Sequence, residues 1–455
     1  MELRLEILAN CIECLKALQH KKISVIINQN IIIISTKESN MDVIVIGAGA
    51  SGLLAAYEAS KKCKVYVIEL KDVPGKKILA TGNGKCNLTN KHMFSDCYNE
   101  NATSFVDKVL KRYSYEDMYQ YFSELPIMLD DEKDYIYPYS KQSKTIVNEL
   151  YNHCLYNNVE FIFNSNVKNI EKEKGKFTVS YIQTENKESK KKTICADKVV
   201  VACGGKVASK LGSDGSGYYL MRKLGHTITE CVPALVPLVC DKSDKKYLEI
   251  LKGVRSKAKV YTETGLSSVG ELQMTDYGIS GIVVFQLSGK INRYLIENKE
   301  IKIYLDFTPD IKKDDIIKFI NKAKDNESKN KISKDKYYIS NINVLLSGFL
   351  NDKIIEAVAL YCKDNNIDAS KPEEIADIIK KFPLTVVSSM GFENAQVTSG
   401  GINLEEVDEN MESKLVSSLY ITGELLDVDG ICGGYNLHFA FASGIIAGKS
   451  ILEKA

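Results

Sequence analysis

The order of apolar and polar positions predicts a strand, a helix and a second strand near residue 50. A predicted strand over residues 42–46, apolar from Val43 onward, ends in glycines, and an alanine-rich stretch with helical spacing follows over 50–61. Further runs of β-branched residues cover 64–70 and 197–205, the second again ending in glycines. Continuous apolar runs of this length are typical of strands buried on both faces of a parallel sheet. We therefore expect an α/β domain with a parallel sheet.

The middle of the chain has a different pattern. Over residues 231–309 and 381–389, short strand-like pieces alternate with turn residues, which predicts a β-rich insert. Residues 310–380 are rich in lysine and have helical spacing, which predicts a helical insert with a solvated face. The final segment returns to the apolar, glycine-rich style of the beginning. We expect one domain made of 41–230 and 390–455, interrupted by the two inserts.

Residues 1–40 stand apart, because Met41 lies directly before the first predicted strand. This segment is either an accessory extension or a set of upstream codons attached by an early start, and we favour the second interpretation. Its removal should leave cofactor binding intact. Cys11 and Cys14 form a C-x-x-C pair on a helical pattern, but no second pair completes a zinc site, so we expect no metal.

Composition narrows the class of protein. With 60 basic and 59 acidic residues, the net charge of +1 creates no general field for nucleic acid or anionic membranes, so we expect neither as a partner. No run approaches the roughly 20 apolar residues of a membrane span. The 12 cysteines are scattered, which fits a reducing compartment better than a disulfide framework. We expect a cytoplasmic enzyme of two or more domains.

The turn after the first strand carries a G-x-G-x-x-G pattern at Gly47, Gly49 and Gly52. In this pattern the first glycine makes the tight turn, the second lets the backbone approach a pyrophosphate, and the third lets helix and strand pack closely. Glu69 lies 22 positions beyond Gly47, near the place of the acid that accepts ribose hydroxyl groups. The sequence therefore predicts a dinucleotide site, and this pattern alone fits FAD and NAD equally.

Residues 420–437 repeat the combination of strand, glycine and acid before an apolar helix. In two-domain flavoproteins such a segment brings an acid to the cofactor and points a helix N-terminus at the flavin, which favours the anionic reduced form. A second G-x-G-x-x-G after a strand, which would mark a nicotinamide domain, does not occur. We therefore expect FAD as the resident cofactor and NAD(P)H as a transient electron donor.

Several motifs together resemble the BaiN/YhiN-like flavoproteins, often described as aminoacetone oxidase family FAD-binding enzymes or NAD(P)/FAD-dependent oxidoreductases. The resemblance covers residues 41 to about 450 in the family's order. It rests on "GAGASGLLAAYEAS", "GKKILATGNGKCNLTN", "VVACGGKVASKLGSDGSGYYLMRKLGH", "GELQMTDYGISG", "VTSGGINLEEVDENMESKL" and "LYITGELLDVDGICGGYNLHFAFASGIIAG". It implies a Rossmann-like FAD-binding domain with a β-rich and a helical subdomain over the active site.

The resemblance also implies which residues contact FAD, in four groups. The phosphates and the adenosine ribose would be held by Gly47, Gly49, Ala50, Ser51, Gly52 and Glu69. A second glycine loop would contribute Lys77, Thr81, Asn83, Gly84 and Asn87. Adenine and the crossing strand would involve Val167, Ala202, Gly204 and Gly205. The flavin side would be lined by Gly423, Glu424, Asp427, Gly434, Tyr435, Asn436 and Leu437.

The chain departs from the family pattern in four places. Lys85 stands where arginine is usual, Asp276 follows Thr275 where histidine is expected, Ile282 replaces a common proline, and His438 replaces glutamine. A proton-donating role of the missing histidine therefore does not carry over to Asp276.

Flavin chemistry leaves the protein mainly with placement and proton transfer. We consider Tyr435, His438 and Tyr277 as candidate proton donors, with packing or hydrogen bonding as the alternative role of each. A redox pair of Cys86 and Cys432 is not favoured, because neither belongs to a C-x-x-C pair. The lone histidines His92, His153 and His226 are expected at the surface or in turns.

The resemblance favours a reductase that saturates a C=C bond of an unsaturated apolar small molecule, such as a steroid enone, with electrons from NAD(P)H. An oxygen-using amine oxidase is one alternative. A flavin-binding sensor, in which the lysine-rich insert contacts a partner, is the other. The sequence leaves the oligomeric state open.

Overall fold

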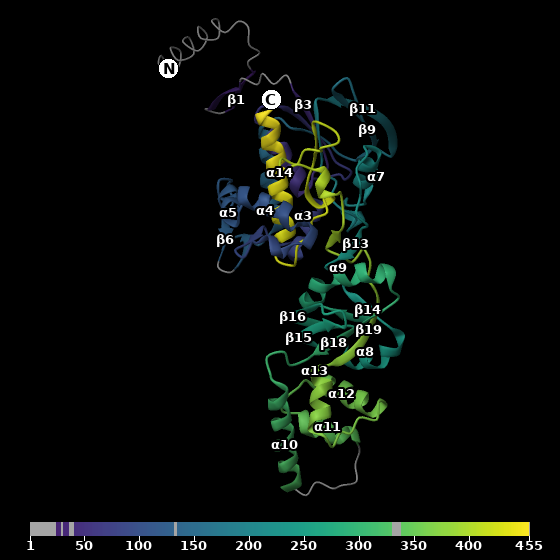
Figure 1. Ribbon diagram of the computed structural model, residues 1–455. Helices are drawn as coiled ribbons and strands as arrows, with labels where there is room; N and C mark the ends of the chain where they lie inside the picture. The colour runs from purple at the N-terminus through teal and green to yellow at the C-terminus, as the bar shows by residue number, and fades with distance from the viewer. Residues whose placement is uncertain (1–23, 29–30, 36–40, 132–133, 330–337, 455) are drawn as a thin grey trace.

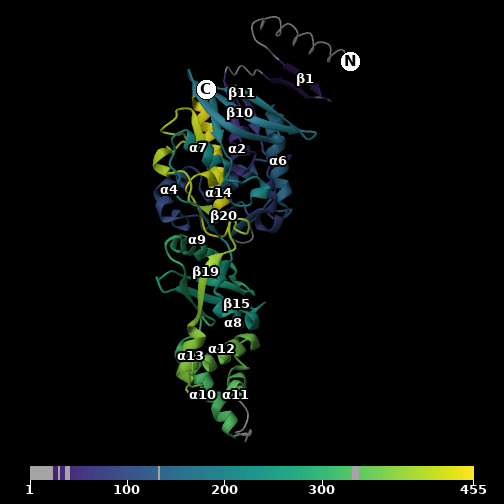
Figure 2. The same ribbon diagram turned by 90° about the vertical axis from the view of Figure 1, so that its right-hand side faces the viewer.

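The computed structural model describes residues 24–28, 31–35, 41–131, 134–329 and 338–454. Figure 1 shows three parts stacked along one axis: a Rossmann-like domain that holds the C-terminus, a barrel in the middle, and a helical subdomain at the far end. The view turned by 90° shows the same order (Figure 2). The barrel therefore lies between the Rossmann-like domain and the helical subdomain.

A five-stranded sheet forms the centre of the Rossmann-like domain, with strand order β21-β12-β3-β4-β8. All neighbouring strands in it are parallel. The strands are β3 (Asp42–Ile46), β4 (Lys64–Ile68), β8 (Glu160–Ile162), β12 (Lys198–Val201) and β21 (Leu419–Ile421). Because β21 comes from the C-terminal segment, the two ends of the chain complete one sheet. The expected parallel α/β domain is confirmed.

Helices α2 (Ala50–Ala59) and α14 (Tyr435–Glu453) pack tightly against each other. A Cβ on Gly444 would lie 2.2 Å from the carbonyl oxygen of Ser51, and one on Gly448 would lie 2.5 Å from Cβ of Glu58. Protein interiors are close-packed, so such approaches require the absence of a side chain. The first and last helices of the domain therefore position each other.

The other elements of this domain surround the sheet. Its remaining helices are α3 (Lys76–Ala80), α4 (Thr103–Arg112), α5 (Tyr115–Ser123), α6 (Ser143–Tyr156) and α7 (Ser216–Lys223). Two small antiparallel sheets contain β5 (Thr89–Asn90), β6 (Leu129–Asp130) and β7 (Tyr135–Pro138), and β9 (Ser165–Glu173), β10 (Lys176–Glu185) and β11 (Glu188–Ala196). A separate hairpin is formed by β1 (Ser24–Asn28) and β2 (Ile31–Ser35).

The barrel is closed by six antiparallel strands in the order β14-β17-β16-β15-β18-β19. They are β14 (Leu238–Cys240), β15 (Arg255–Thr262), β16 (Ser267–Met274), β17 (Gly278–Ser280), β18 (Ile301–Asp306) and β19 (Phe382–Ser389). Helices α8 (Lys245–Leu251) and α9 (Ile282–Glu297) pack outside it. Because β14 pairs with β19, the chain enters and leaves the insert side by side.

The helical subdomain contains α10 (Lys313–Lys329), α11 (Tyr338–Leu346), α12 (Asp352–Asp364) and α13 (Pro372–Lys380). Its buried residues, such as Ile316, Ile355 and Ile375, join one core with barrel residues such as Phe382. The sheet of the Rossmann-like domain has its own core. The inserts therefore share a core that is separate from the Rossmann-like one. None of the described helices is both long and apolar enough to cross a bilayer.

The two cores meet where β13 (Val232–Ala234) pairs with β20 (Val397–Ser399) and α9 lies over this pair. A Cβ on Gly289 of α9 would lie 3.0 Å from Cβ of Ala234. Phe285 of α9 and Cys432 pack on the same small apolar cluster. We call this region, made of β13, β20, α9 and the turn 427–432, the junction.

Candidate functional site

The first glycine turn is shaped by two backbone contacts and one opening. A Cβ on Gly47, whose φ is +103°, would lie 2.5 Å from the carbonyl oxygen of Ala202, and one on Gly52 would lie 1.9 Å from that of Gly47. A Cβ on Gly49 would meet nothing within 4 Å. Packing therefore requires glycine at 47 and 52, whereas Gly49 leaves the backbone accessible to a ligand.

Helix α2 begins directly after this turn, and no described side chain caps its N-terminus. The free N–H groups of a first helical turn, together with the helix dipole, form a site for a phosphate. The confirmed order of β3, glycine turn and α2 therefore provides the geometry that a pyrophosphate requires.

Glu69 lies just after β4 and is 8% exposed. Its Oε2 accepts a 2.6 Å hydrogen bond from the backbone N–H of Ala48, and its Oε1 accepts a 2.8 Å bond from that of Lys71. Burial raises the pKa of the Glu69 carboxyl, and these two hydrogen bonds oppose the increase. A carboxylate offers about four acceptor positions, so Glu69 can fix the glycine turn and still accept ribose hydroxyl groups.

The second glycine loop reaches the C-terminal segment through two contacts. Lys77 on α3 forms an ion pair with Glu424, which is 347 residues away in sequence. The amide of Asn87 lies against the N-cap of α14, where a Cβ on Gly434 would be 3.0 Å from Asn87 Oδ1. Gly82 and Asn83 between them adopt left-handed conformations, which the Thr81–Gly84 turn requires. The loop thus connects the start of α3 to the start of α14.

The segment after β12 and the C-terminal segment around residue 424 lie against each other at this site. A Cβ on Gly205 would lie 2.9 Å from Glu424 Oε1, which accepts a 2.8 Å hydrogen bond from the backbone N–H of Thr398. A Cβ on Gly423 would lie 2.7 Å from the hydroxyl oxygen of Ser51. Four segments that are distant in sequence, around residues 50, 80, 204 and 424, therefore converge on one site.

The donor and acceptor groups of this site fit FAD. The side-chain oxygens Asn87 Oδ1 and Thr422 Oγ1 are buried without a hydrogen-bond partner among the described residues. No described side chain caps α14, whose N-cap Gly434 has a φ of +96°. An elongated dinucleotide with a phosphate at α2 and a polar ring at α14 would satisfy both helix N-termini.

Two further residues expected to contact FAD are Val167 and Asp427. Val167 belongs to β9, and two residues before it the N–H of Ser165 donates to the carbonyl of Glu69 over 2.9 Å. Val167, which we expected near adenine, therefore lies on a strand that is hydrogen-bonded to Glu69. Asp427 is buried, and burial raises the pKa of its carboxyl.

The three candidate proton donors are not brought together. The hydroxyl of Tyr435 donates to the carbonyl of His92 over 3.1 Å, at the start of α14. The ring nitrogens of His438 bond to Thr89 Oγ1 at 2.8 Å and to the carbonyl of Tyr113 at 3.0 Å, inside the domain. Tyr277 lies in the turn between β16 and β17, beside the exposed ion pair of Lys252 with Asp276.

The cysteines near the site are protonated thiols. Burial raises the pKa of Cys86 and of Cys432 to about 12, and both are free. Within the described residues, His, Cys, Asp and Glu side chains form no group of three that could hold a metal ion. Cys11 and Cys14 lie outside the described residues.

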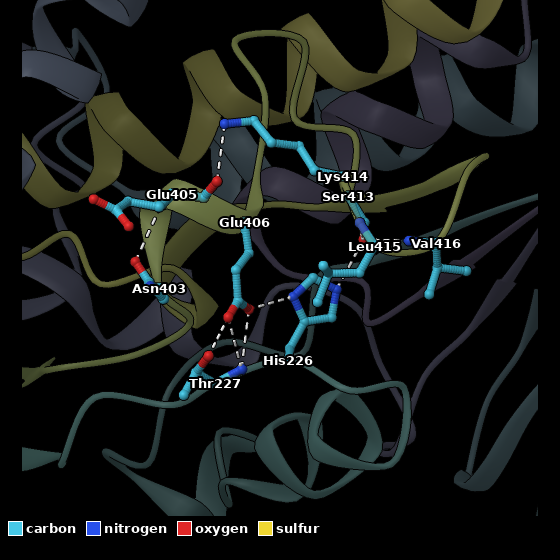
Figure 3. A network of polar contacts seen from close by, with 9 residues as sticks. All are labelled: His226, Thr227, Asn403, Glu405, Glu406, Ser413, Lys414, Leu415 and Val416. Atoms are coloured by element: carbon cyan, nitrogen blue, oxygen red, sulfur yellow. Dashed lines mark hydrogen bonds and ion pairs between the residues drawn. The ribbon is translucent and has the colours of Figure 1, made fainter.

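His226 was expected at the surface or in a turn, and the surface position is wrong, whereas the residue does directly follow the turn at 224–225. Its side chain is buried between Glu406 and Ser413, with 2.9 Å from Nδ1 to Glu406 Oε2 and 2.9 Å from Nε2 to Ser413 Oγ (Figure 3). Ser413 Oγ also accepts hydrogen bonds from the backbone N–H groups of Leu415 and Val416. Since the hydroxyl is buried and occupied, this serine–histidine–glutamate row ties two loops together and does not form a nucleophile.

A cavity of about 520 Å³ opens beside the segment that follows Gly205. Its lining includes Lys206, Asp214, Tyr218, Arg222, Glu230 and Cys231. Charged groups of both signs therefore face this opening next to Gly205.

Sequence reasoning missed three polar residues of the junction. The guanidinium of Arg293 on α9 donates to Ser399 Oγ over 3.2 Å, and Asp429 lies close to both. Arg293 stands in a segment without a recognisable motif, whereas Ser399 and Asp429 lie within two of the motifs that carry the family resemblance. Neither motif indicates that these three side chains come together.

Comparison with known proteins agrees with this geometry. The family model described as "HI0933-like protein Rossmann domain" matches residues 41–450. A 3-dehydro-bile acid delta(4,6)-reductase of Clostridium scindens is 38% identical over 424 residues, which are 90% of this chain and 98% of that protein. A ribosomal RNA dihydrouridine synthase of Haemophilus influenzae is 28% identical over 418 residues, 90% of this chain and 98% of that protein.

Solved structures are similar at lower identity. The 3-ketosteroid-delta4-(5alpha)-dehydrogenase of Rhodococcus jostii has a TM-score of 0.47 and 14% identity, covering 92% of this chain and 98% of that chain. The matched family, the bile-acid reductase and the FAD-compatible site agree with one another, and the protein is an FAD-dependent oxidoreductase. With its model matching residues 41–450, the chain belongs to the HI0933-like family.

Proposed function

We propose that this protein reduces a C=C bond conjugated to a ketone in a steroid-like small molecule, with NAD(P)H as the electron donor. The observation that carries the proposal is the 38% identity to the bile-acid delta(4,6)-reductase over 90% of this chain and 98% of that protein. The name of that relative describes the reduction of ring C=C bonds in a bile acid that carries a 3-oxo group. A substrate of this class is apolar over most of its surface.

Different residues of the site would bind different parts of FAD. FAD, when bound, supplies the electron pair for the substrate carbon. The glycine turn and the N-terminus of α2 hold its pyrophosphate, and Glu69 accepts hydrogen bonds from its ribose. The N-terminus of α14 places positive partial charge beside the flavin ring. The ion pair of Lys77 with Glu424 holds the second glycine loop against the C-terminal segment.

The second half of the reaction needs a proton on the neighbouring carbon. Tyr435 keeps its proton, because burial raises the pKa of its hydroxyl. We assign His438 to support of α14, because both ring nitrogens already bond to protein groups. Tyr277 remains a candidate only if the barrel brings its turn to the site.

A second substrate class is favoured by the relatives named as ribosomal RNA dihydrouridine synthases, 28% and 27% identical over 90% of this chain. Their product requires hydrogen addition to a C=C bond conjugated to a carbonyl in a pyrimidine, which is the same bond type. The net charge of +1 speaks against RNA as a substrate, since phosphate contacts dominate such affinity.

The experiment is a reoxidation assay under exclusion of oxygen. The FAD-loaded protein is reduced with NADH or NADPH and then mixed with a 3-oxo-4-ene steroid, a 3-oxo-4,6-diene bile acid or uridine-containing RNA. We expect rapid return of the oxidised flavin absorbance with the steroids alone. Reoxidation by RNA alone would assign the second class. In a separate arm an amine is mixed with protein whose flavin is still oxidised, and reduction of that flavin would assign an oxidase.

A further inference from the structure

An unpartnered carboxyl oxygen lies at the junction. Asp429 Oδ1 is shielded from solvent and has no hydrogen-bond partner among the described residues. On the facing helix α9, the side-chain oxygen of Gln286 is also buried without a partner among them. A buried acceptor or donor without a partner costs free energy, so unpaired groups of this kind mark places where a bound molecule completes the contacts.

The turn that carries Asp429 is held firmly by its backbone. The side chain of Asn99 accepts a 3.0 Å hydrogen bond from the N–H of Asp429, and the N–H of Asn99 donates to the carbonyl of Asp429 over 2.9 Å. The side chain of Asn436 bonds to both the N–H and the carbonyl of Gly430 at 2.8 Å. Asp429 Oδ1 thus has no hydrogen-bond partner among the described residues while the backbone is fixed, which is the arrangement of a preorganised functional group.

Charged and titratable groups face this carboxyl from each neighbouring element. Its own segment contributes Asp427 and Glu424, while α9 contributes Arg293 and β20 contributes the hydroxyl of Ser399. Burial raises the pKa of Asp429 to about 6, and the two acids act in the same direction, whereas Ser399 and Arg293 oppose them. Glu424 is itself paired with Lys77. A group with such a pKa exchanges a proton near neutral pH.

The segment that precedes α14 and helix α9 of the insert meet at Asp429. Asp429 is five residues before Gly434, the N-cap of α14, and Cys432 between them packs on the same small apolar cluster as Phe285 of α9. Lys290 of α9 forms an ion pair of 3.1 Å with Glu100, the neighbour of Asn99. The carboxyl therefore lies between the flavin-side helix start and the insert that covers it.

We infer that Asp429 is the catalytic acid that donates the proton to the substrate in the proposed C=C reduction. The inference rests on the proposed function. Reduced FAD would supply a hydride, the electron pair together with its hydrogen, to one carbon of the C=C bond, and the neighbouring carbon would take the proton from Asp429 Oδ1. The C=C bond becomes a single bond, FAD is oxidised, and the Asp429 carboxylate is protonated again from solvent.

The test compares Asp429→Asn, Asp429→Glu and the matched control Asp310→Asn, which removes an exposed carboxylate paired with Lys257 on the barrel. Each FAD-loaded protein is reduced with dithionite, so that the result does not depend on the natural donor. It is then mixed with androst-4-ene-3,17-dione, and flavin absorbance is followed over a range of pH. The affinity for FAD is measured separately by fluorescence titration.

We expect Asp429→Asn to slow reoxidation by the steroid about 100-fold or more, within the range of general acid catalysis, with FAD affinity within about threefold of wild type. Asp429→Glu should restore part of the rate, and Asp310→Asn should match wild type. The wild-type rate should fall as the pH rises above about 6, because the acid form is lost, and the Asn variant should not share this decline.

Two results would overturn the inference alone: a wild-type rate in Asp429→Asn, or loss of FAD affinity with normal reoxidation once FAD is saturating, which would make the carboxylate a cofactor ligand. A wild-type protein whose reduced flavin no enone reoxidises would instead overturn the proposed function, and the inference with it.

Discussion

In the glycine turn a Cβ on Gly52 would lie 1.9 Å from a backbone oxygen, whereas in the junction Asp429 Oδ1 has no polar partner among the described residues. The first region is defined by backbone shape and leaves no room for change. The second is defined by side-chain chemistry, with a buried carboxyl oxygen that a ligand can pair with. Substitutions in the turn should therefore alter folding or cofactor affinity, and substitutions in the junction should alter the reaction.

The largest effect is expected for Gly52→Ala. The added Cβ would collide with the carbonyl of Gly47, and its next neighbour is Ala202 Cβ at 3.2 Å, so neither side can yield easily. We expect a loss of about 3 kcal/mol or more of folding stability and protein without flavin. Urea denaturation and the visible spectrum measure both. Wild-type stability in this variant would show that the turn is less tightly packed than described.

Gly49→Ala separates cofactor binding from packing within the same turn. A Cβ there meets nothing within 4 Å, and the φ of −83° suits alanine. Stability should therefore change by less than about 1 kcal/mol, while FAD affinity should fall roughly 100-fold, since the methyl group occupies the space left for the pyrophosphate. Fluorescence titration with FAD is the measurement. Unchanged affinity would mean that the phosphate does not approach Gly49.

A smaller, pH-dependent effect is expected for His438→Gln. Burial lowers the pKa of His438 to about 4 in the folded protein, against an ordinary value of 6.5. The unfolded chain therefore takes up a proton first as the pH falls, and the folded state loses stability below about pH 6.5. Between about pH 7.5 and pH 5.5 this loss amounts to about 1.3 kcal/mol, and glutamine should abolish it.

The measurement for His438 is urea denaturation of both proteins at several pH values. Wild type should lose more stability than the variant over this range. Parallel curves would place the titrating group elsewhere, and a variant that loses steroid reduction at constant stability would return His438 to the reaction.

The sequence was sufficient to predict the Rossmann-like fold because its evidence is local. The apolar run before Gly47, the helical spacing after it and the acid at Glu69 lie within about 30 residues, and each has one physical explanation. The resemblance to a flavoprotein family then added the cofactor. The return of the same style after residue 390 predicted a domain split by inserts, and β21 does complete the sheet.

The junction could not be predicted in the same way. Lys77 and Glu424 are 347 residues apart in sequence. Arg293, Ser399 and Asp429 come from three segments, and their contacts depend on the packing of the barrel and its helix α9 against the Rossmann-like domain. His226 was misplaced for the same reason, since Glu406 and Ser413 are 180 and 187 residues away. Polar contacts over such separations leave no periodic trace in the sequence.

The central claim is that the two ends of the chain hold FAD so that an enone beneath the inserts is reduced. Mass spectrometry of the product tests it most directly, after incubation of the purified protein with FAD, NAD(P)H and a 3-oxo-4-ene steroid under exclusion of oxygen. We expect a product that has gained two hydrogen atoms, with one nicotinamide oxidised per molecule. Unchanged steroid recovered from flavin-loaded, NAD(P)H-reduced protein would contradict it.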